Sequence, residues 1–160
     1  MKQIQTVLSS EPVLVLPDFS LPFAVMTDAS NVGIGGVLLQ LVADLWMPIC
    51  YVSRKLLERE TRYSTIEREA LGIVYTIEKL AKYLWGKQFV LFVDHKPLTY
   101  LSTSKYANSR LMRWALSLQE FQYTVQPIEG VNNTLADLLS RSQFDQNLSV
   151  QRVCNIATTH

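Results

Sequence analysis

The sequence contains few of the residues that build several common kinds of functional centre. It has two cysteines, Cys50 and Cys154, and two histidines, His95 and the terminal His160. Two cysteines form neither a disulfide framework nor a cysteine-based metal cage, which fits a reducing compartment. With one internal histidine, a Ser/His/Asp triad has little to build on, and we expect His95 to make local hydrogen bonds. These absences point away from disulfide-rich, metal-cage and triad-based proteins.

Long apolar runs and a strong charge of one sign are also missing. No run of about eighteen apolar residues occurs, and the start of the chain lacks the apolar segment of a signal peptide. We therefore expect a soluble, cytoplasmic protein that does not enter a membrane. The net charge is only +1, whereas a protein that grips nucleic acid by itself usually has a strong basic excess. If this chain acts on nucleic acid, we expect another module to hold the substrate.

The length and the hydrophobic content predict one domain with extensions at both ends. A chain of 160 residues, 48% of them hydrophobic, suffices for one core and is short for two. After a short possible helix, two prolines near the start favour an extended segment. We predict that residues 1–20 connect to an upstream part, that 21–142 form the domain, and that 143–160 form a polar, aperiodic tail or linker.

The pattern of apolar and turn residues predicts an α/β fold. Two β-rich runs flank a cluster of Asp, Ser, Asn and Gly, which predicts a hairpin, and Pro48 indicates an edge position or a bulge in a third run. A long helix then precedes an apolar strand, so a right-handed crossover and parallel pairing are expected. We therefore predict a five-stranded mixed sheet, a three-strand antiparallel meander followed by parallel strands, flanked by helices. The predicted strands are 23–27, 34–41, 46–53, 89–93 and 121–128, and the predicted helices are 65–85, 96–101, one capped by Asn108, and one from Asn133 or Thr134 to Ser140.

Two aspartates come where predicted strands end. Asp28 closes the first strand, on the same face as Ala24 and Met26 by the two-residue period of a strand, and Asp94 closes the fourth. Either residue alone is ordinary in a turn. Together they indicate a site, because ligands bind outside the carboxyl ends of strands in open α/β sheets.

The long helix offers two glutamates that helical periodicity alone cannot rank. Ser64 and Glu67 fit a capping box, which gives Glu67 a structural role. Glu69 has no such explanation, so we favour it over Glu67 as a candidate ligand. Asp137, in the last predicted helix, stays open between a ligand and a capping residue, because Thr134 and Asp137 have the spacing of a second capping box.

Further polar residues have weaker claims to a functional role. Arg110, Arg113 and Trp114 mix basic and aromatic character as a nucleic-acid-binding helix does. Since Trp114 fits the apolar stripe, we expect it in the core and both arginines open to phosphate. Ser30 and Asn31, in the turn after the first strand, are further candidates for substrate binding. The glycines beyond this turn serve the hairpin better than a phosphate loop, because a strand and not a helix follows them.

Five segments, taken in order, closely resemble one known family. They are PFAVMTDASNVGIGGVLLQ, YVSRKL, YSTIEREALGIV, VDHKPL and NNTLADLLSR. Over residues 8–142 the chain resembles the ribonuclease H domain of gypsy-type retrotransposon and related retroviral reverse transcriptases. The resemblance implies a ribonuclease H-like fold in a fragment of a Pol polyprotein, joined to the polymerase part through the residues before the first strand.

The same resemblance implies a reaction and a set of ligands. The family is an endonuclease that hydrolyses the RNA strand of RNA:DNA hybrids during reverse transcription, which places it in virus-like particles. Asp28, Glu69, Asp94 and Asp137 would bind two Mg²⁺ ions, which prefer oxygen ligands and which Mn²⁺ can replace. By resemblance, Asp28 bridges both ions, Glu69 and Asp94 hold the one on the leaving side, and Asp137 holds the one that carries the attacking water.

Two departures from the wider ribonuclease H family qualify this expectation. Residues 128–133 contain no histidine, and residues 100–109 contain one lysine and no basic, tryptophan-rich protrusion. We therefore predict weak activity and weak binding in isolation, with the polymerase part supplying affinity. Two alternatives stay open. One is a catalytically silent scaffold or tether, of the connection type or domesticated; the other is a retroviral-type integrase core, which has a glutamate on a late helix where this chain has Asp137.

Overall fold

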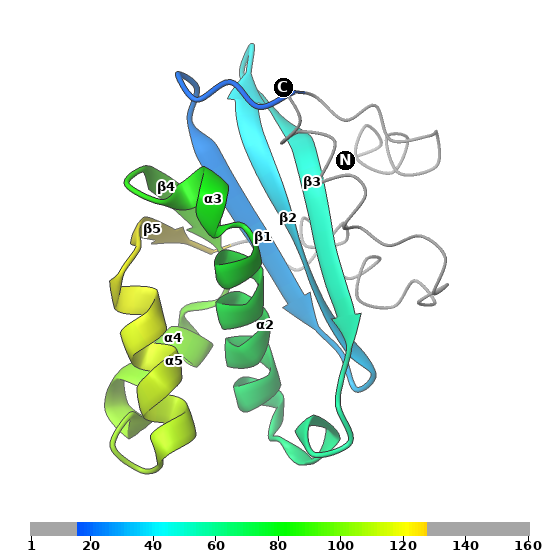
Figure 1. Cartoon of the computed structure of the whole chain (residues 1–160), viewed down its shortest axis with the longest axis vertical. Helices are drawn as coiled ribbons and strands as arrows, with labels where there is room; N and C mark the ends of the chain where they lie inside the picture. The colour runs from blue at the N-terminus through cyan, green and yellow to red at the C-terminus, as the bar shows by residue number, and fades with distance from the viewer. Residues whose placement is uncertain (1–15, 128–160) are drawn as a thin grey trace.

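Five strands form one mixed sheet in the order β3-β2-β1-β4-β5 (Figure 1). The computed structural model describes residues 16–127. Strands β1, β2 and β3 pair antiparallel, whereas β4 is parallel to β1 and β5 is parallel to β4. The predicted meander and the parallel strands after it are therefore confirmed. The strands are β1 (Phe23–Ala29), β2 (Gly33–Val42), β3 (Leu45–Lys55), β4 (Gln88–Phe92) and β5 (Gln122–Gln126).

The predicted hairpin is the first unit of the sheet. Asp28 pairs with Gly35, and β1 continues to Ala29, so Asp28 is the second-last residue of its strand and does not end it. On the other side of β2, edge strand β3 changes register next to Pro48. This irregularity follows from proline, which has no N–H to donate to the neighbouring strand. The predicted edge position and bulge are both confirmed.

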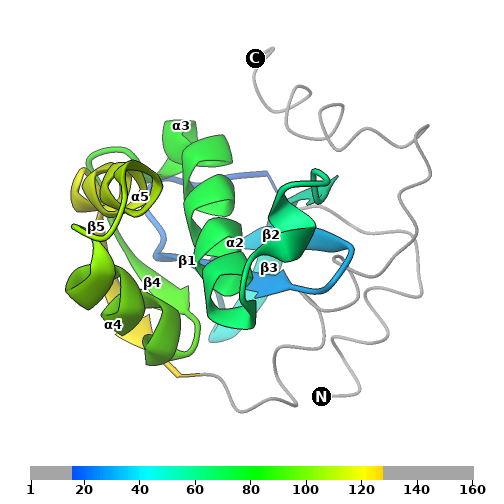
Figure 2. The same cartoon turned by 90° about the horizontal axis from the view of Figure 1, so that it is seen from below.

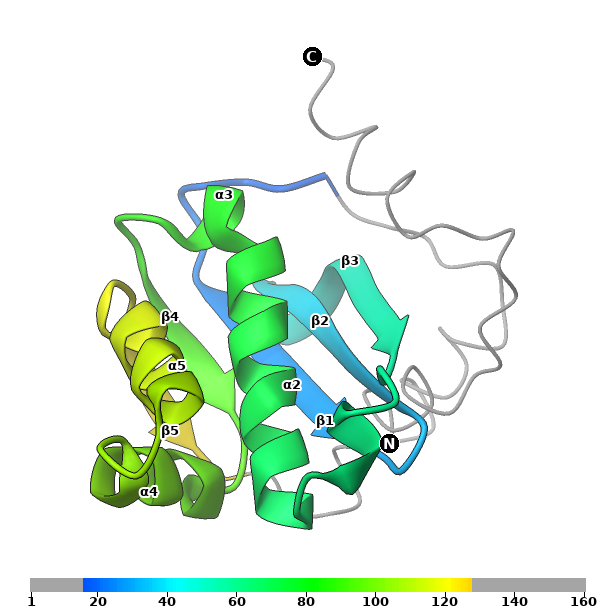
Figure 3. The same ribbon diagram turned by 60° about the horizontal axis from the view of Figure 1, so that its bottom comes forward.

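The main helices lie together on one face of the sheet (Figures 2 and 3). They are α2 (Thr65–Lys79), α4 (His95–Ser104) and α5 (Ser109–Gln119), and the short helices are η1 (Glu60–Arg62) and α3 (Ala81–Leu84). The side chains of Ser64, Asp94 and Asn108 each accept a hydrogen bond from a backbone N–H in the first turn of α2, α4 and α5. Such caps satisfy N–H groups that have no partner within the helix.

The prediction of one helix over 65–85 is wrong, because the chain divides there into α2 and α3. At Leu80 the backbone leaves helical geometry, with φ −96° and ψ 8°. The side chains of Leu80 and Leu84 are both fully buried. The apolar stripe thus continues across the break, and for this reason its period did not reveal it. Gly86, with φ 72°, follows α3 as predicted.

The core between α2 and the sheet depends on a close approach at Gly36. A Cβ atom at Gly36 would overlap the side chain of Thr76 on α2. Gly72, one turn before Thr76, faces the carbonyl oxygen of Asp28, and a Cβ atom there would lie an ordinary 3.5 Å from it. Of the predicted helical stripe, Ala70, Ile73, Val74 and Ile77 are buried, whereas Ile66 is only partly buried. These contacts set the height of α2 above β1.

The predicted extensions fall largely outside the described residues. Of the connector 1–20, the last part packs on the domain: buried Gln40 accepts a hydrogen bond from Asp18 N and donates one to Leu16 O. The tail 143–160, the last predicted helix and Asp137 lie outside residues 16–127. Among the helices that the structure describes, none is long and apolar enough to cross a membrane.

Candidate functional site

The parallel pairing of β1 and β4 brings two of the predicted acids to one edge of the sheet. Met26 and Phe92 are register partners in this pair. Asp28 and Asp94 each come two residues later along the chain, and Asp94 caps α4, separated from the end of β4 by Val93. Both acids therefore stand at the carboxyl ends of adjacent parallel strands, where α/β folds bind ligands.

The third acid comes from α2, which crosses above this edge. Glu69 lies one turn before Gly72, the residue that faces the carbonyl oxygen of Asp28. A small pocket of about 60 Å³ has all three acidic residues in its lining. Its lining residues are Thr27, Asp28, Ala29, Glu69, Ile73, Val93, Asp94 and Pro97. The structure therefore brings Asp28, Glu69 and Asp94 together, and we call this the acid pocket.

The electrostatics of the acid pocket are those of concentrated negative charge. Burial raises the pKa of Glu69, and the charge of Asp94 raises it further, while Lys96 and Arg68 act in the opposite direction. Burial and a like charge both disfavour the ionised carboxylate, so the two effects add. A bound cation would relieve both.

The donors of the acid pocket fit a hard cation, because carboxylate oxygens are the ligands that Mg²⁺ prefers. Each aspartate also serves its own backbone: Asp28 accepts a hydrogen bond from Ala29 N at 2.9 Å, and Asp94 accepts one from Lys96 N at 3.0 Å. With these side-chain positions, residues 16–127 contain no group of three or more His, Cys, Asp or Glu close enough to hold a metal ion. The assignment of Asp28, Glu69 and Asp94 as metal ligands stays a prediction, as does that of Asp137.

Glu67 differs from Glu69 in where its side chain goes. The predicted cap is present, since Ser64 Oγ accepts a hydrogen bond from Glu67 N at 3.2 Å. The other half of the predicted capping box is wrong, because the Glu67 carboxylate accepts hydrogen bonds from Tyr100 Oη at 2.9 Å and from Arg110 at 3.1 Å. Glu67 therefore does not line the acid pocket and joins α2 to α4 and α5.

We predicted that Arg110 is open to phosphate, and in the structure it is not. Its guanidinium forms an ion pair with Glu67 and lies over the rings of Tyr63, at 4.1 Å, and Trp114, at 5.4 Å from their centroids. Trp114 is buried, as expected for a residue of the apolar stripe. Arg113 is exposed, and its contact with substrate stays a prediction.

The turn between β1 and β2 holds the other candidate substrate residues. Ser30 Oγ accepts hydrogen bonds from Val32 N and Gly33 N, so this side chain already supports the turn. Asn31 and His95 are both exposed, and neither is among the lining residues of the acid pocket. Substrate binding by Ser30 and Asn31 stays a prediction.

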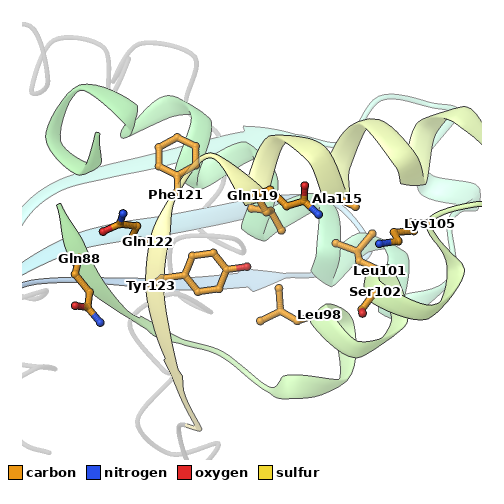
Figure 4. Close-up of a pocket in the computed structure, with 11 residues that line it drawn as sticks. Gln88, Leu98, Leu101, Ser102, Lys105, Ala115, Gln119, Phe121, Gln122 and Tyr123 are labelled. Atoms are coloured by element: carbon orange, nitrogen blue, oxygen red, sulfur yellow. The ribbon is translucent and has the colours of Figure 1, made fainter. Parts of the chain in front are cut away.

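A larger cavity, about 470 Å³, lies between α4, α5 and the start of β5 (Figure 4). Leu98 and Leu101 form part of its apolar wall, and Tyr123 faces them from β5. Its polar lining comes from Gln88, Ser102, Lys105, Gln119 and Gln122. In the described part of the chain, its lining includes no aspartate or glutamate. Sequence reasoning missed this cavity, because the residues concerned come from four separate elements and show no common pattern.

The fold is that of a ribonuclease H-like domain. A foamy viral protease-reverse transcriptase solved with an RNA/DNA hybrid has a TM-score of 0.58 and 18% identity, over 81% of this chain and 18% of that one. LC11-RNase H1, also solved with an RNA/DNA hybrid, has a TM-score of 0.57 and 17% identity, over 79% of this chain and 99% of that one. At these identities the likeness concerns the fold, and the predicted ribonuclease H-like fold is confirmed.

Sequence comparison then identifies the family. Residues 18–121 match the RNase H-like domain found in reverse transcriptase, and the chain belongs to this family. The Pol polyprotein of transposon 297 from Drosophila melanogaster is 38% identical over 91% of this chain. That of transposon gypsy, from the same organism, is 36% identical over 99% of it. The chain spans only 13% and 15% of these two relatives. The resemblance inferred from the five segments is confirmed.

Proposed function

We propose that this domain is an endonuclease that hydrolyses the RNA strand of RNA:DNA hybrids during reverse transcription. The observation that supports it most is the convergence of Asp28, Glu69 and Asp94 on one pocket. Three separate elements supply these acids, in a chain that belongs to the reverse transcriptase RNase H-like family. A purely structural role gives no reason to collect like charges at one site, since their repulsion opposes folding.

In this proposal the three acids and Asp137 hold two Mg²⁺ ions, or Mn²⁺ in their place. When bound, such ions would lower the pKa of a water and stabilise the charge that develops on the phosphodiester oxygens. The chain's own residues orient the site: β1 presents Asp28, the cap of α4 presents Asp94, and α2 presents Glu69. Glu69 must be ionised to act as a ligand, and its raised pKa means that protons compete with metal at acidic pH.

The proposed partners are an RNA:DNA hybrid and the polymerase part of the same polyprotein. The foamy viral protease-reverse transcriptase and LC11-RNase H1 described above were each solved in complex with an RNA/DNA hybrid. The relatives from transposons 297 and gypsy are retrovirus-related Pol polyproteins. We propose that this chain is one domain of a polyprotein of the same kind. From the family resemblance we also propose that the protein acts in the cytoplasm, within virus-like particles.

A labelled RNA:DNA hybrid incubated with Mg²⁺ tests the proposal, with Asp28→Asn as the matched control. The native chain should shorten the RNA strand, and the control should not. The assay is repeated with the chain fused to its polymerase part, because the isolated domain is expected to bind weakly. No cleavage even in the fusion would favour the scaffold, and strand joining would favour the integrase; either result overturns the proposal.

A further inference from the structure

Glu67 connects the three main helices at a single carboxylate. Its side chain extends from the first turn of α2 and is only 17% exposed. One oxygen accepts from the hydroxyl of Tyr100 on α4, and the other accepts from the guanidinium of Arg110 on α5. The hydrogen bond to Glu67 is also the largest cause of the raised pKa of Tyr100. Both carboxylate oxygens are thus committed to partners on other helices.

The cationic partner of this carboxylate is itself held in place. Arg110 lies in the first turn of α5, its side chain is 29% exposed, and its Nε is buried without a hydrogen-bond partner. The rings of Tyr63 and Trp114, which meet edge to face at 6.0 Å, both lie beneath the guanidinium. Stacking on two rings leaves the arginine little freedom to turn toward a solvent ligand.

The same helices carry two of the acids. Glu69 comes two residues after Glu67 on α2, and α4 begins at its cap Asp94, six residues before Tyr100. The Glu67 connection therefore links the helix that presents Glu69 to the helix that Asp94 caps. Because these two acids border one pocket and carry like charges, their repulsion acts to separate α2 from α4.

We propose that Glu67 is a positioning residue, which holds α4 and α5 against the first turn of α2 and thereby keeps Asp94 beside Glu69. This inference rests on the proposed function for its consequence, the assembly of a metal site. It assigns Glu67 and Glu69 different tasks although they are two residues apart. It also gives Arg110 and Tyr100 a task that involves no contact with substrate.

Two variants test this, and the chain offers a matched control. Tyr100→Phe removes one hydroxyl and keeps the ring, and Glu67→Gln keeps the shape and removes the charge. The control is Glu78→Gln, since Glu78 also joins α2 to α5, through Ser117 at 2.6 Å, but at the far end of α2. Each full chain is measured in two ways: Mn²⁺ affinity by isothermal titration calorimetry, and hydrogen exchange of the α4 amides without metal.

We expect Tyr100→Phe and Glu67→Gln to weaken Mn²⁺ binding about tenfold, the lower range for residues that support metal ligands. We also expect faster exchange in α4, and neither change in Glu78→Gln. If exchange is unchanged, or if it quickens while the affinity stays native, the positioning role is wrong. The proposed function fails if the native chain binds no Mn²⁺, or if Asp28→Asn binds it equally well. In that case the exchange measurement alone decides whether Glu67 positions α4.

Discussion

The acid pocket and the larger cavity between α4, α5 and β5 differ in size and in the chemistry of their lining. The smaller of the two is the one that contains the acidic residues. The acid pocket measures about 60 Å³ and has three acidic residues in its lining, whereas the larger cavity measures about 470 Å³ and is lined mainly by leucine, glutamine and aromatic residues, with Lys105 as the charged residue among them. The small site lies where two parallel strands end beneath a helix, and the large one lies between two helices and an edge strand. The proposed function therefore assigns the chemistry by the convergence of acidic residues and not by the volume of a cavity.

The largest expected effect comes from removing one carboxylate of the acid pocket. Asp28→Asn, Glu69→Gln and Asp94→Asn should each lower hybrid cleavage at least about 100-fold, because a metal site loses one of few oxygen ligands. Gln119→Ala, in the larger cavity, should leave the rate within about twofold. Initial rates on a labelled hybrid at fixed Mg²⁺ measure both. An equal loss from Gln119→Ala would contradict the contrast between the two cavities.

The next effect concerns the affinity of the domain for its proposed substrate, the RNA:DNA hybrid. The net charge of +1 gives the isolated chain little electrostatic attraction to a polyanion. We expect fusion to the polymerase part to raise hybrid affinity about 100-fold, because a second binding module raises the local concentration of substrate. Fluorescence anisotropy with a labelled hybrid at one salt concentration compares the two proteins. Tight binding by the isolated chain, equal to that of a free-standing bacterial ribonuclease H, would contradict this.

A pair of glycines tests the packing that sets α2 above the acid pocket. Gly36→Ala places a Cβ against Thr76 and should lower the free energy of unfolding by about 1–3 kcal/mol, as overpacking does. Gly72→Ala meets only ordinary contacts and should raise it by up to about 1 kcal/mol, since alanine favours a helix. Urea unfolding measures both values.

The opposite signs of these two changes are the informative result. If Gly36→Ala also raises the stability, α2 has room to move away from the sheet. The height of α2, and with it the place of Glu69, would then not depend on the contact between Gly36 and Thr76. The double variant Gly36→Ala with Thr76→Ala serves as a control, because the smaller side chain should recover part of the loss.

The smallest expected effect is a pH dependence that belongs to the acid pocket. Burial and the charge of Asp94 raise the pKa of Glu69 above its ordinary 4.5. The folded state therefore holds this proton more tightly than the unfolded state, so Glu69 lowers stability as pH rises from about 4.5 through the folded pKa. Without metal, Glu69→Gln should be more stable than the native chain at neutral pH, and the difference should vanish in acid.

Urea unfolding across this pH range, repeated with Mg²⁺, measures the effect. Added Mg²⁺ should stabilise the native chain more than Glu69→Gln, because a ligand that binds only the folded state stabilises it. This prediction would be contradicted if Glu69→Gln were less stable than the native chain at neutral pH without metal. In that case the fold would favour the ionised form of Glu69, and burial and the charge of Asp94 would not dominate its surroundings.

Sequence reasoning located the parts of the fold that depend on near neighbours. The hairpin, the caps at Ser64 and Asn108, the bulge at Pro48 and the turn at Gly86 all follow from preferences within a few residues. The same rules placed Asp28 and Asp94 within two residues of where β1 and β4 end. Their meeting in one pocket followed from the additional expectation of a parallel crossover, which the structure contains.

The tertiary structure alone decided which partners distant residues find. Glu67 bonds to Tyr100 and Arg110, which are 33 and 43 residues away, and this placed Arg110 between helices and not on an open surface. The break at Leu80 and the larger cavity are likewise invisible to periodicity. The physical reason is that helical and strand patterns report which side of an element faces the core. Which charged side chains meet depends on the packing of whole elements against one another, and no local spacing encodes that.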